Sequence, residues 1–253
     1  MSAASTPDLE EAARAKQAVR ERVWALLERE RVARFPGSRG RIPNFAGAPA
    51  AAARLASQPA WQAAGVVKAN PGQPAAPGPG ACPGRGQARV RGRPRLADEH
   101  PFILLDPARL DVPPRRAASI TGSARAGRPV GVAELHPVDL VVCGSVAVNR
   151  HGARVGNGGG FSGLEFALLV EAGLVGRQTL LATTVHPLQV LDETLPETPH
   201  DFRVDLIVTA EEVVTCRRSR RPPGILWEHL DATKIAAIPA LAARAPRHAT
   251  NKP

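Results

Sequence analysis

An almost unbroken apolar run over residues 137–148 constrains the fold more than any other feature of this chain. It reads PVDLVVCGSVAV, without the polar alternation that a half-exposed strand shows. Such a run is typical of a strand that is buried on both faces of a parallel sheet. We therefore expect this strand at the centre of a sheet that is covered on both sides.

Alternating extended and helical patterns surround this run. Apolar segments over residues 179–185 and 204–209 predict further strands, and the pattern over 162–172 predicts a helix. The other expected elements are a helix from Thr6 to about Arg34, helical turns over 48–64 broken at Pro59, strands at 65–68 and 101–105, and a short helix at 231–236. The alternation predicts an α/β fold, a three-layer sandwich around a mostly parallel sheet.

Residues 70–94 interrupt the pattern. Six prolines and six glycines occupy these 25 positions, and neither a helical nor a strand period survives. Such a stretch gains too little from burial to offset the entropy of ordering it. We expect a single domain over residues 1–245 in which 70–94 is a flexible or degenerate insert, followed by a disordered tail at 246–253.

The charge balance favours anionic partners. The formal net charge is +10, from 33 lysines and arginines against 23 aspartates and glutamates. Nucleotides, polyglutamates and RNA fit this sign of charge, and an arginine-rich codon bias with a solvated surface is the alternative. The chain shows no membrane-length apolar run, no signal peptide at its polar N-terminus, and no metal or disulfide spacing of its three cysteines. These features predict a soluble, cytoplasmic monomer without a membrane partner.

A glycine-rich loop is the most informative local motif. Residues 156–160 read Gly-Asn-Gly-Gly-Gly and open the helix expected at 162–172. Backbone N–H groups at such a place can hold an anion at the positive end of the helix dipole. The loop is not a Walker motif, since no Lys-Ser or Lys-Thr follows it. A tight turn that needs positive φ angles is the alternative interpretation.

Four charged or titratable side chains outside this loop are candidate functional residues because of the positions at which they lie. Lys16 and Arg20 are four residues apart, so they share one helix face that could hold phosphate oxygens or be solvated. Asp205 lies on an apolar strand and needs a partner there, either Mg²⁺ or a nearby arginine. His186 follows a predicted strand, where it would contact a ligand or simply be hydrogen-bonded.

Together these features resemble the 5-formyltetrahydrofolate cyclo-ligase family, also called methenyltetrahydrofolate synthetase. The matching motifs are Lys16-x-x-x-Arg20, the strand over 138–148, the turn Arg150-His151-Gly152, the loop 156–163, and Val204-Asp205. Further segments are similar to the branch of methenyltetrahydrofolate synthetase domain-containing proteins: residues 41–45, Gly144-Ser145, Leu164-Glu165, and Pro223-Gly224-Ile225 with Trp227.

The resemblance implies a cyclo-ligase-like fold and a ligase of one-carbon folate metabolism. It would use ATP and Mg²⁺ to cyclise 5-formyltetrahydrofolate to 5,10-methenyltetrahydrofolate. The implied catalytic residues are Lys16, Arg20 and Asn157. The nucleotide would contact Lys16, Arg20, Gly156, Asn157, Gly158, Gly159, Gly160 and Phe161. The folate would contact Gly144, Ser145, Phe161 and His186, and the metal would be held by Asp205 and Glu165.

Several positions depart from the family pattern. Asn157 stands where the family loop has Arg or Lys, and Gly163 where it has a metal-binding Asp. The apolar strand that similar proteins place before Pro-Arg-Leu is not predicted before residues 94–96. The alternative function is therefore a weakened or inactive member that binds nucleotide, folate or RNA.

Overall fold

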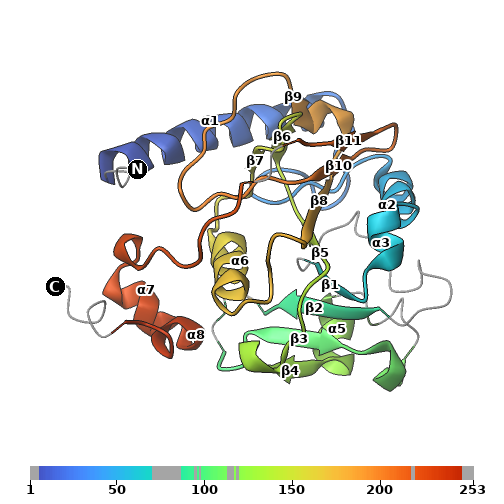
Figure 1. Ribbon diagram of the computed structural model, residues 1–253. Coiled ribbons are helices and arrows are strands. Elements are labelled where there is room, and N and C mark those ends of the chain that lie inside the picture. Colours follow the sequence, from blue (N-terminus) through green and yellow to red (C-terminus); the bar gives the residue numbers. More distant parts are fainter. Residues whose placement is uncertain are drawn as a thin grey trace.

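An eight-stranded mixed sheet forms the centre of the computed structural model, which describes residues 6–69, 87–93, 96, 98–112, 117, 120–217 and 220–246 (Figure 1). The strand order is β11-β10-β8-β5-β1-β2-β3-β4. The strands are β1 (Val66–Ala69), β2 (Ala88–Gly92), β3 (Phe102–Leu105), β4 (Arg128–Val130), β5 (Leu140–Cys143), β8 (Leu180–Thr184), β10 (Leu206–Val208) and β11 (Val213–Thr215). Four of the neighbouring pairs are parallel and three antiparallel, which confirms a mostly parallel sheet.

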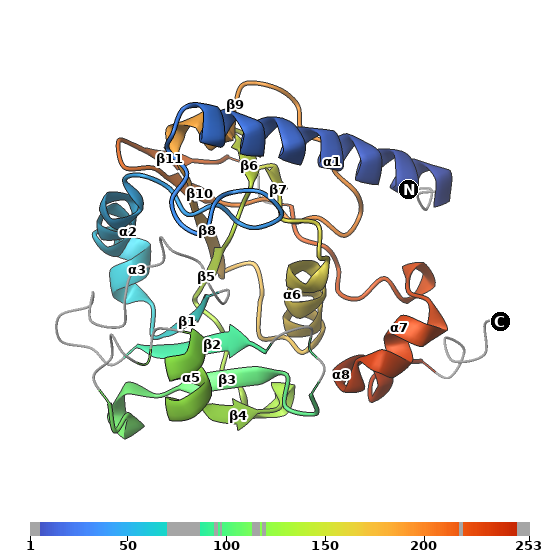
Figure 2. The same cartoon turned by 180° about the vertical axis from the view of Figure 1, so that it is seen from behind.

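Helices cover both faces of this sheet. On one face, Leu140 and Val142 of β5 belong to an apolar cluster with Leu55 and Trp61. On the other face, the alternate residues of β5 pack in a cluster that includes Phe166. The helices on the two faces are α2 (Ala48–Ala56) with α3 (Pro59–Ala63), and α6 (Phe161–Glu171) (Figures 1 and 2). The expected three-layer α/β sandwich is therefore confirmed.

The predicted strand over 137–148 is divided between two sheets. Only β5 lies in the large sheet, where it pairs in parallel with β1 and β8. The chain then turns at Gly144, where a Cβ atom would lie 2.8 Å from Ile42, and continues as β6 (Ala147–Asn149). A second sheet joins β6 to β7 (Arg154–Val155) and β9 (Val190–Leu191). The bend places β7, and the glycine loop after it, above the large sheet.

The long N-terminal helix α1 (Thr6–Arg29) packs on this second sheet. Its buried face carries Val23 and Leu27, which contact a cluster that includes Ala147 and Val155. The helix ends five residues earlier than expected because Arg31 adopts a left-handed backbone with φ 55°. The N–H of Val32 then donates to the Leu27 carbonyl at 3.1 Å, a bond typical of a helix C-terminus.

Strand β2 corrects the expectation for residues 70–94. Residues 88–92 form a buried strand, parallel to β1 and antiparallel to β3. The alternating arginines concealed it, because a buried guanidinium needs partners that the sequence does not show. Here Arg89 lies over the Trp61 ring at 5.1 Å, and Arg91 Nη1 donates to Ser123 Oγ at 3.3 Å. Residues 70–86 and 94, and the expected disordered tail beyond 246, lie outside the described residues.

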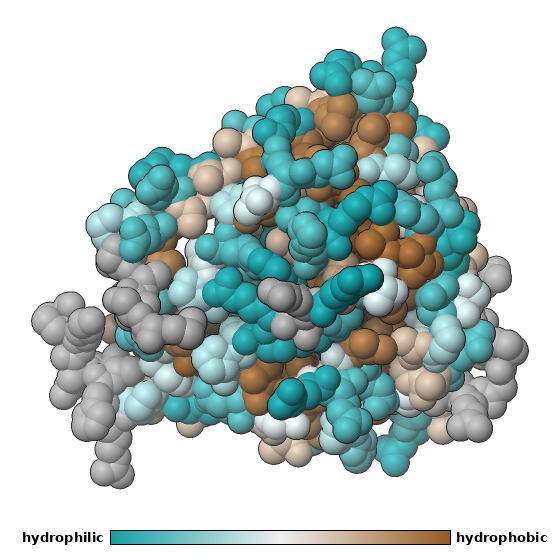
Figure 3. Space-filling view, turned by 45° about the horizontal axis from the view of Figure 1, so that its top comes forward, coloured by the Kyte–Doolittle hydropathy of each residue, from teal (hydrophilic) through white to brown (hydrophobic). Residues whose placement is uncertain are grey.

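The C-terminal segment, residues 220–246, packs against α6. It contains η5 (Trp227–His229), α7 (Ala232–Ala237) and α8 (Pro239–Ala242), and its Ile235 and Leu241 share a cluster with Leu168. The other elements are α5 (Ile120–Ala126), η2 (Pro107–Arg109), η3 (Val132–Glu134) and η4 (Pro187–Gln189). In the part of the chain that the structure describes, no helix has the length and hydropathy needed to cross a membrane. Figure 3 shows one face covered mainly by hydrophilic side chains, with smaller apolar patches between them.

Candidate functional site

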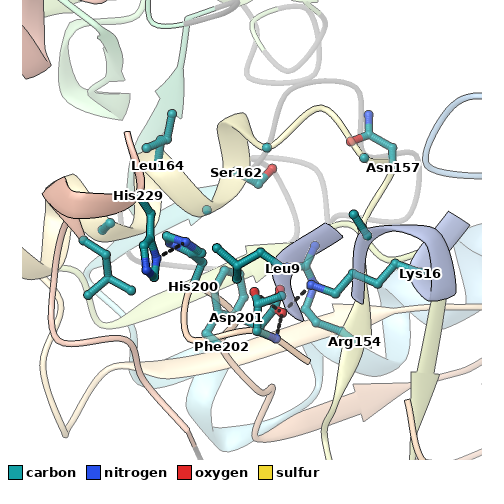
Figure 4. Close-up of a pocket in the computed structure, with 18 of the residues that line it drawn as sticks. Leu9, Lys16, Arg154, Asn157, Ser162, Leu164, His200, Asp201, Phe202 and His229 are labelled. Atoms are coloured by element: carbon teal, nitrogen blue, oxygen red, sulfur yellow. Dashed lines mark hydrogen bonds and ion pairs between the residues drawn. The ribbon is translucent and has the colours of Figure 1, made fainter. Parts of the chain in front are cut away.

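A cavity of about 360 Å³ lies between α1, the glycine loop, the start of α6 and the C-terminal segment (Figure 4). This volume is in the range of small-molecule sites in proteins. Its charged lining is mainly cationic: Lys16, Arg20, Arg154 and Lys234. Asp201 is the one carboxylate among the described lining residues, so the cavity is suited to an anionic ligand.

Asp201 and Lys16 form an ion pair at the cavity wall. The Thr198 N–H and hydroxyl also donate to Asp201 Oδ2, at 2.6 and 2.8 Å. Burial alone would raise the pKa of Asp201, but the Lys16 charge and these hydrogen bonds outweigh it, so the pKa is lower than usual. Asp201 therefore stays ionised and holds the Lys16 ammonium at the wall.

Arg20 ties α1 to the glycine loop. Its side chain is buried, and its Nε donates to the Gly156 carbonyl at 2.7 Å. Burial lowers the pKa of Arg20, and the nearby Asp201 charge opposes that effect. Gly158 has a φ of 96°, and a Cβ atom there would lie 3.3 Å from Arg20 Cζ. The loop therefore needs glycine at this position both for its backbone and for the close approach of Arg20.

Arg154 is a third cation at this end of the cavity. It is 7% exposed and lies over the Phe202 ring at 4.6 Å. Its Nη2 donates to the Gly144 carbonyl at 2.8 Å, and its Nε has no hydrogen-bond partner among the described residues. No described carboxylate pairs with this guanidinium, so Arg154 keeps its capacity to bind an anion.

Two histidines line the opposite part of the cavity. His229 of the C-terminal segment and His200 share a ring-nitrogen hydrogen bond of 2.8 Å. Burial, followed by repulsion from His229, lowers the pKa of His200. The pair is therefore a contact between the C-terminal segment and the loop that carries Asp201.

The structure brings six of the predicted site residues to the cavity and leaves the others outside its lining. Those that line it are Lys16, Arg20, Gly156, Asn157, Gly158 and Gly160. The turn interpretation of the loop is also correct, since Gly158 and Gly160 both have positive φ. Gly159 and Phe161 do not line the cavity, and Phe161 packs against the apolar cluster that α6 shares with α7 and α8.

The residues that the resemblance assigned to folate lie elsewhere. Ser145 Oγ shares a hydrogen bond of 2.9 Å with Thr183 Oγ1 in the buried core. Gly144 contributes its carbonyl to Arg154 but does not line the cavity. His186 Nδ1 accepts from the N–H of Leu188 at 3.2 Å, which is the hydrogen-bonded alternative for this residue.

Both predicted metal ligands are paired with cations of the chain. Asp205 Oδ2 accepts from Arg221 at 2.6 Å and from the Leu181 N–H at 2.8 Å, so the salt-bridge alternative is confirmed. Glu165 is buried and pairs with Lys68 at 2.6 Å. Neither carboxylate lines the cavity. Among the described residues, no three His, Cys, Asp or Glu side chains gather as a metal site would require.

Sequence reasoning missed Arg154, Asp201, His200, His229 and Lys234. Arg154 precedes the glycine loop by two residues, and His200-Asp201 precedes the strand near residue 204. The signal in the sequence for Arg154, His200 and Asp201 was that they lie close to these predicted site elements. Their convergence depends on how the loops and the C-terminal segment fold back on α1.

The chain is similar to known proteins. Residues 110–210 match the family model of the 5-formyltetrahydrofolate cyclo-ligase family. Proteins named methenyltetrahydrofolate synthase domain-containing protein are similar: that of Mus musculus is 37% identical over 89% of this chain, and that of Bos taurus is 36% identical over 92%. The chain spans 62% of the length of each of these relatives.

One solved structure is also similar, the NMR structure of Aquifex aeolicus 5,10-methenyltetrahydrofolate synthetase. It is 20% identical, with a TM-score of 0.45, over 83% of this chain and 95% of that chain.

Proposed function

The chain belongs to the 5-formyltetrahydrofolate cyclo-ligase family, and from that premise we propose that it uses ATP to cyclise 5-formyltetrahydrofolate to 5,10-methenyltetrahydrofolate. The observation that carries the proposal is the convergence of Lys16, Arg20 and Arg154 with the glycine loop at one cavity. Three cations and exposed backbone N–H groups at one place suit the phosphates of a nucleotide.

The reaction needs charge stabilisation more than covalent chemistry from the protein. The formyl oxygen attacks the γ-phosphorus of ATP, a new P–O bond forms, and the bond to ADP breaks. N10 of the folate then attacks the activated carbon and loses its proton, and phosphate leaves with the former formyl oxygen. Negative charge develops on the transferring phosphoryl group throughout. In the proposed mechanism Lys16, Arg20 and Arg154 bind that charge, and Asp201 keeps Lys16 in position.

The described residues do not fit a protein-held Mg²⁺ ion. Asp205 and Glu165 are engaged by Arg221 and Lys68, and Asp201 is engaged by Lys16. Since Mg²⁺ prefers free carboxylate oxygens and water, we assign no step of the mechanism to a metal held by this chain.

Turnover in the presence of MgATP, followed by the absorbance of the methenyl product, tests the proposal. We expect Lys16→Ala to lower kcat/KM by about 100-fold or more, since a charge that stabilises the transition state is lost. Arg14→Ala is the matched control, because Arg14 lies on the same helix but is exposed and outside the cavity. A folded wild-type protein without turnover would overturn the catalytic proposal.

One observation favours a second function, binding without catalysis. No carboxylate of the described cavity lining is free of a cationic partner, and Asn157 adds no charge to the loop. In that case MgATP would raise the melting temperature by mass action while no methenyl product forms. The two readouts together separate an enzyme from a binding protein.

A further inference from the structure

The cavity is lined by cations both on α1 and on the C-terminal segment, and each of these elements also contributes apolar residues. Along α1, Lys16 lies seven residues and Arg20 eleven residues beyond Leu9, which corresponds to about 10 and 16 Å of helix. Leu9 and Ala13 also line the cavity, so its wall becomes apolar toward the N-terminus of α1. Figure 4 shows Leu9 between Lys16 and Arg154 on one side and His200 and His229 on the other.

The C-terminal segment closes this second side. In Figures 1 and 2, α7 lies on the same side of the molecule as the N-terminal end of α1. The segment contributes the apolar side chains of Ile225, Leu226 and Leu230 to the lining, and then Lys234 of α7. Along this segment, the apolar lining residues are thus followed by one more cation.

Lys234 is available for a ligand. Its side chain is half-buried, and no described carboxylate lies within ion-pairing distance of its ammonium. Asp231 accepts the backbone N–H of Lys234 at 2.6 Å as a helix cap, and Glu228 is exposed and outside the lining. The His200–His229 hydrogen bond fixes the segment that brings Lys234 to the cavity.

We infer that Lys234 is a specificity-determining residue that binds the glutamate carboxylates of the folate, at the opposite end of the cavity from the phosphates. The inference rests on the proposed function. A folate has a flat aromatic middle and an anionic glutamate end, which correspond to the apolar wall and to Lys234. An ammonium is a point charge with three donors, so it binds a carboxylate in more than one orientation. The family model ends at residue 210, so Lys234 lies in a part of the chain which that model does not describe.

Two probes isolate this contact: 5-formyltetrahydrofolate, and 5-formyltetrahydropteroate, which lacks the glutamate. Calorimetric titration of the full chain should show wild type binding the glutamate-bearing probe about tenfold more tightly than the truncated probe. Lys234→Met should abolish this preference by weakening only the glutamate-bearing probe, and Lys234→Arg should restore most of it. Thermal melts show that each variant is folded.

Arg244→Met is the matched control. Arg244 is a half-buried cation of the same segment that donates to the Ala240 carbonyl and does not line the cavity. If Lys234→Met keeps the preference, or if Arg244→Met loses it equally, the inference on Lys234 is wrong and the proposed function stands. If folded wild type binds neither probe, the proposed function fails and this inference fails with it.

Discussion

Asp201 is the residue that fixes the position of Lys16 at the wall of the cavity. It is the one acid among the described lining residues, and it holds Lys16 while accepting two hydrogen bonds from Thr198. A carboxylate in this position lowers the charge of the cavity by one unit but fixes where a cation stands. The site therefore gives up some attraction for an anion in exchange for a defined position of Lys16.

We predict that Asp201→Asn lowers the free energy of unfolding by about 2 kcal/mol at pH 7, because charged hydrogen bonds are lost. Since the pKa of Asp201 is lower in the folded chain than its ordinary value of 3.8, its stabilisation is complete above that pH. It is lost as the pH falls through the folded pKa. Urea titrations at pH 7 and below pH 4 should therefore show a difference between wild type and variant that shrinks in acid.

Glu10→Gln is the control for this prediction. Glu10 pairs with Arg14 on the exposed surface of the same helix that carries Lys16. An exposed pair of this kind contributes roughly 0 to 1 kcal/mol, so the variant should unfold almost like wild type at both pH values. An equal loss in Glu10→Gln and Asp201→Asn would contradict the role of Asp201.

At the scale of elements, α6 is joined to the large sheet by a buried charge pair. Glu165 of α6 reaches Lys68 of β1 across β2, and both side chains are less than a tenth exposed. A Cβ atom on Gly92 of β2 would lie 2.1 Å from Glu165 Oε1, so only glycine leaves room for the carboxylate. The start of α6, which lines the cavity, is thereby fixed over the sheet.

Gly92→Ala should destabilise the protein by about 3 kcal/mol, because the new methyl group displaces Glu165 and leaves buried charge unpaired. Gly163→Ala on α6 is the matched glycine substitution: nothing lies within 4 Å of its added Cβ atom. Alanine is the better helix former there, so this variant should be unchanged or more stable by up to about 1 kcal/mol. Thermal unfolding of both variants tests this prediction. Equal melting temperatures for Gly92→Ala and Gly163→Ala would contradict the argument that only glycine at position 92 leaves room for Glu165.

The same elements show what could be predicted from the sequence. The run that became β5 is apolar on both sides, so its burial and its parallel neighbours could be inferred from residue types alone. Strand β2 could not, because the burial of Arg89 and Arg91 depends on partners from distant parts of the chain, among them Trp61 and Ser123. The end of α1 depended on the positive φ of Arg31, for which an arginine gives no signal.

The residues of the candidate site also divide into those that could be predicted from the sequence and those that could not. Lys16 and Arg20 and the glycine loop could be predicted, since a helix period and a glycine run are local patterns. Asp201 and Lys234 could not, because they reach the cavity only when two distant segments fold against α1. The pairing of Asp205 with Arg221 also needed the structure, since sequence alone favoured metal and arginine equally.

At the scale of the whole molecule, positive charge is in excess both overall and in the cavity. The chain carries a formal net charge of +10, and the face in Figure 3 is mainly hydrophilic. Many surface charges are already paired, as Arg150 is with Glu212 and Arg128 with Glu134. Among the described residues that line the cavity, four cations face one carboxylate, so the cavity shares the positive excess of the whole chain.

This distribution predicts a salt dependence that is specific to anionic ligands. Salt screens charges over about 10 Å at 0.1 M and about 3 Å at 1 M, so higher salt weakens attraction from cations at the cavity wall. We expect the Kd for ATP to rise roughly 3- to 10-fold between 0.05 and 0.5 M NaCl, measured by calorimetry. Adenosine, which has the same base and sugar without phosphates, should bind with a Kd that changes little over this range. If both ligands weaken equally, the cations of the cavity do not hold the phosphates, and salt acts on the protein as a whole.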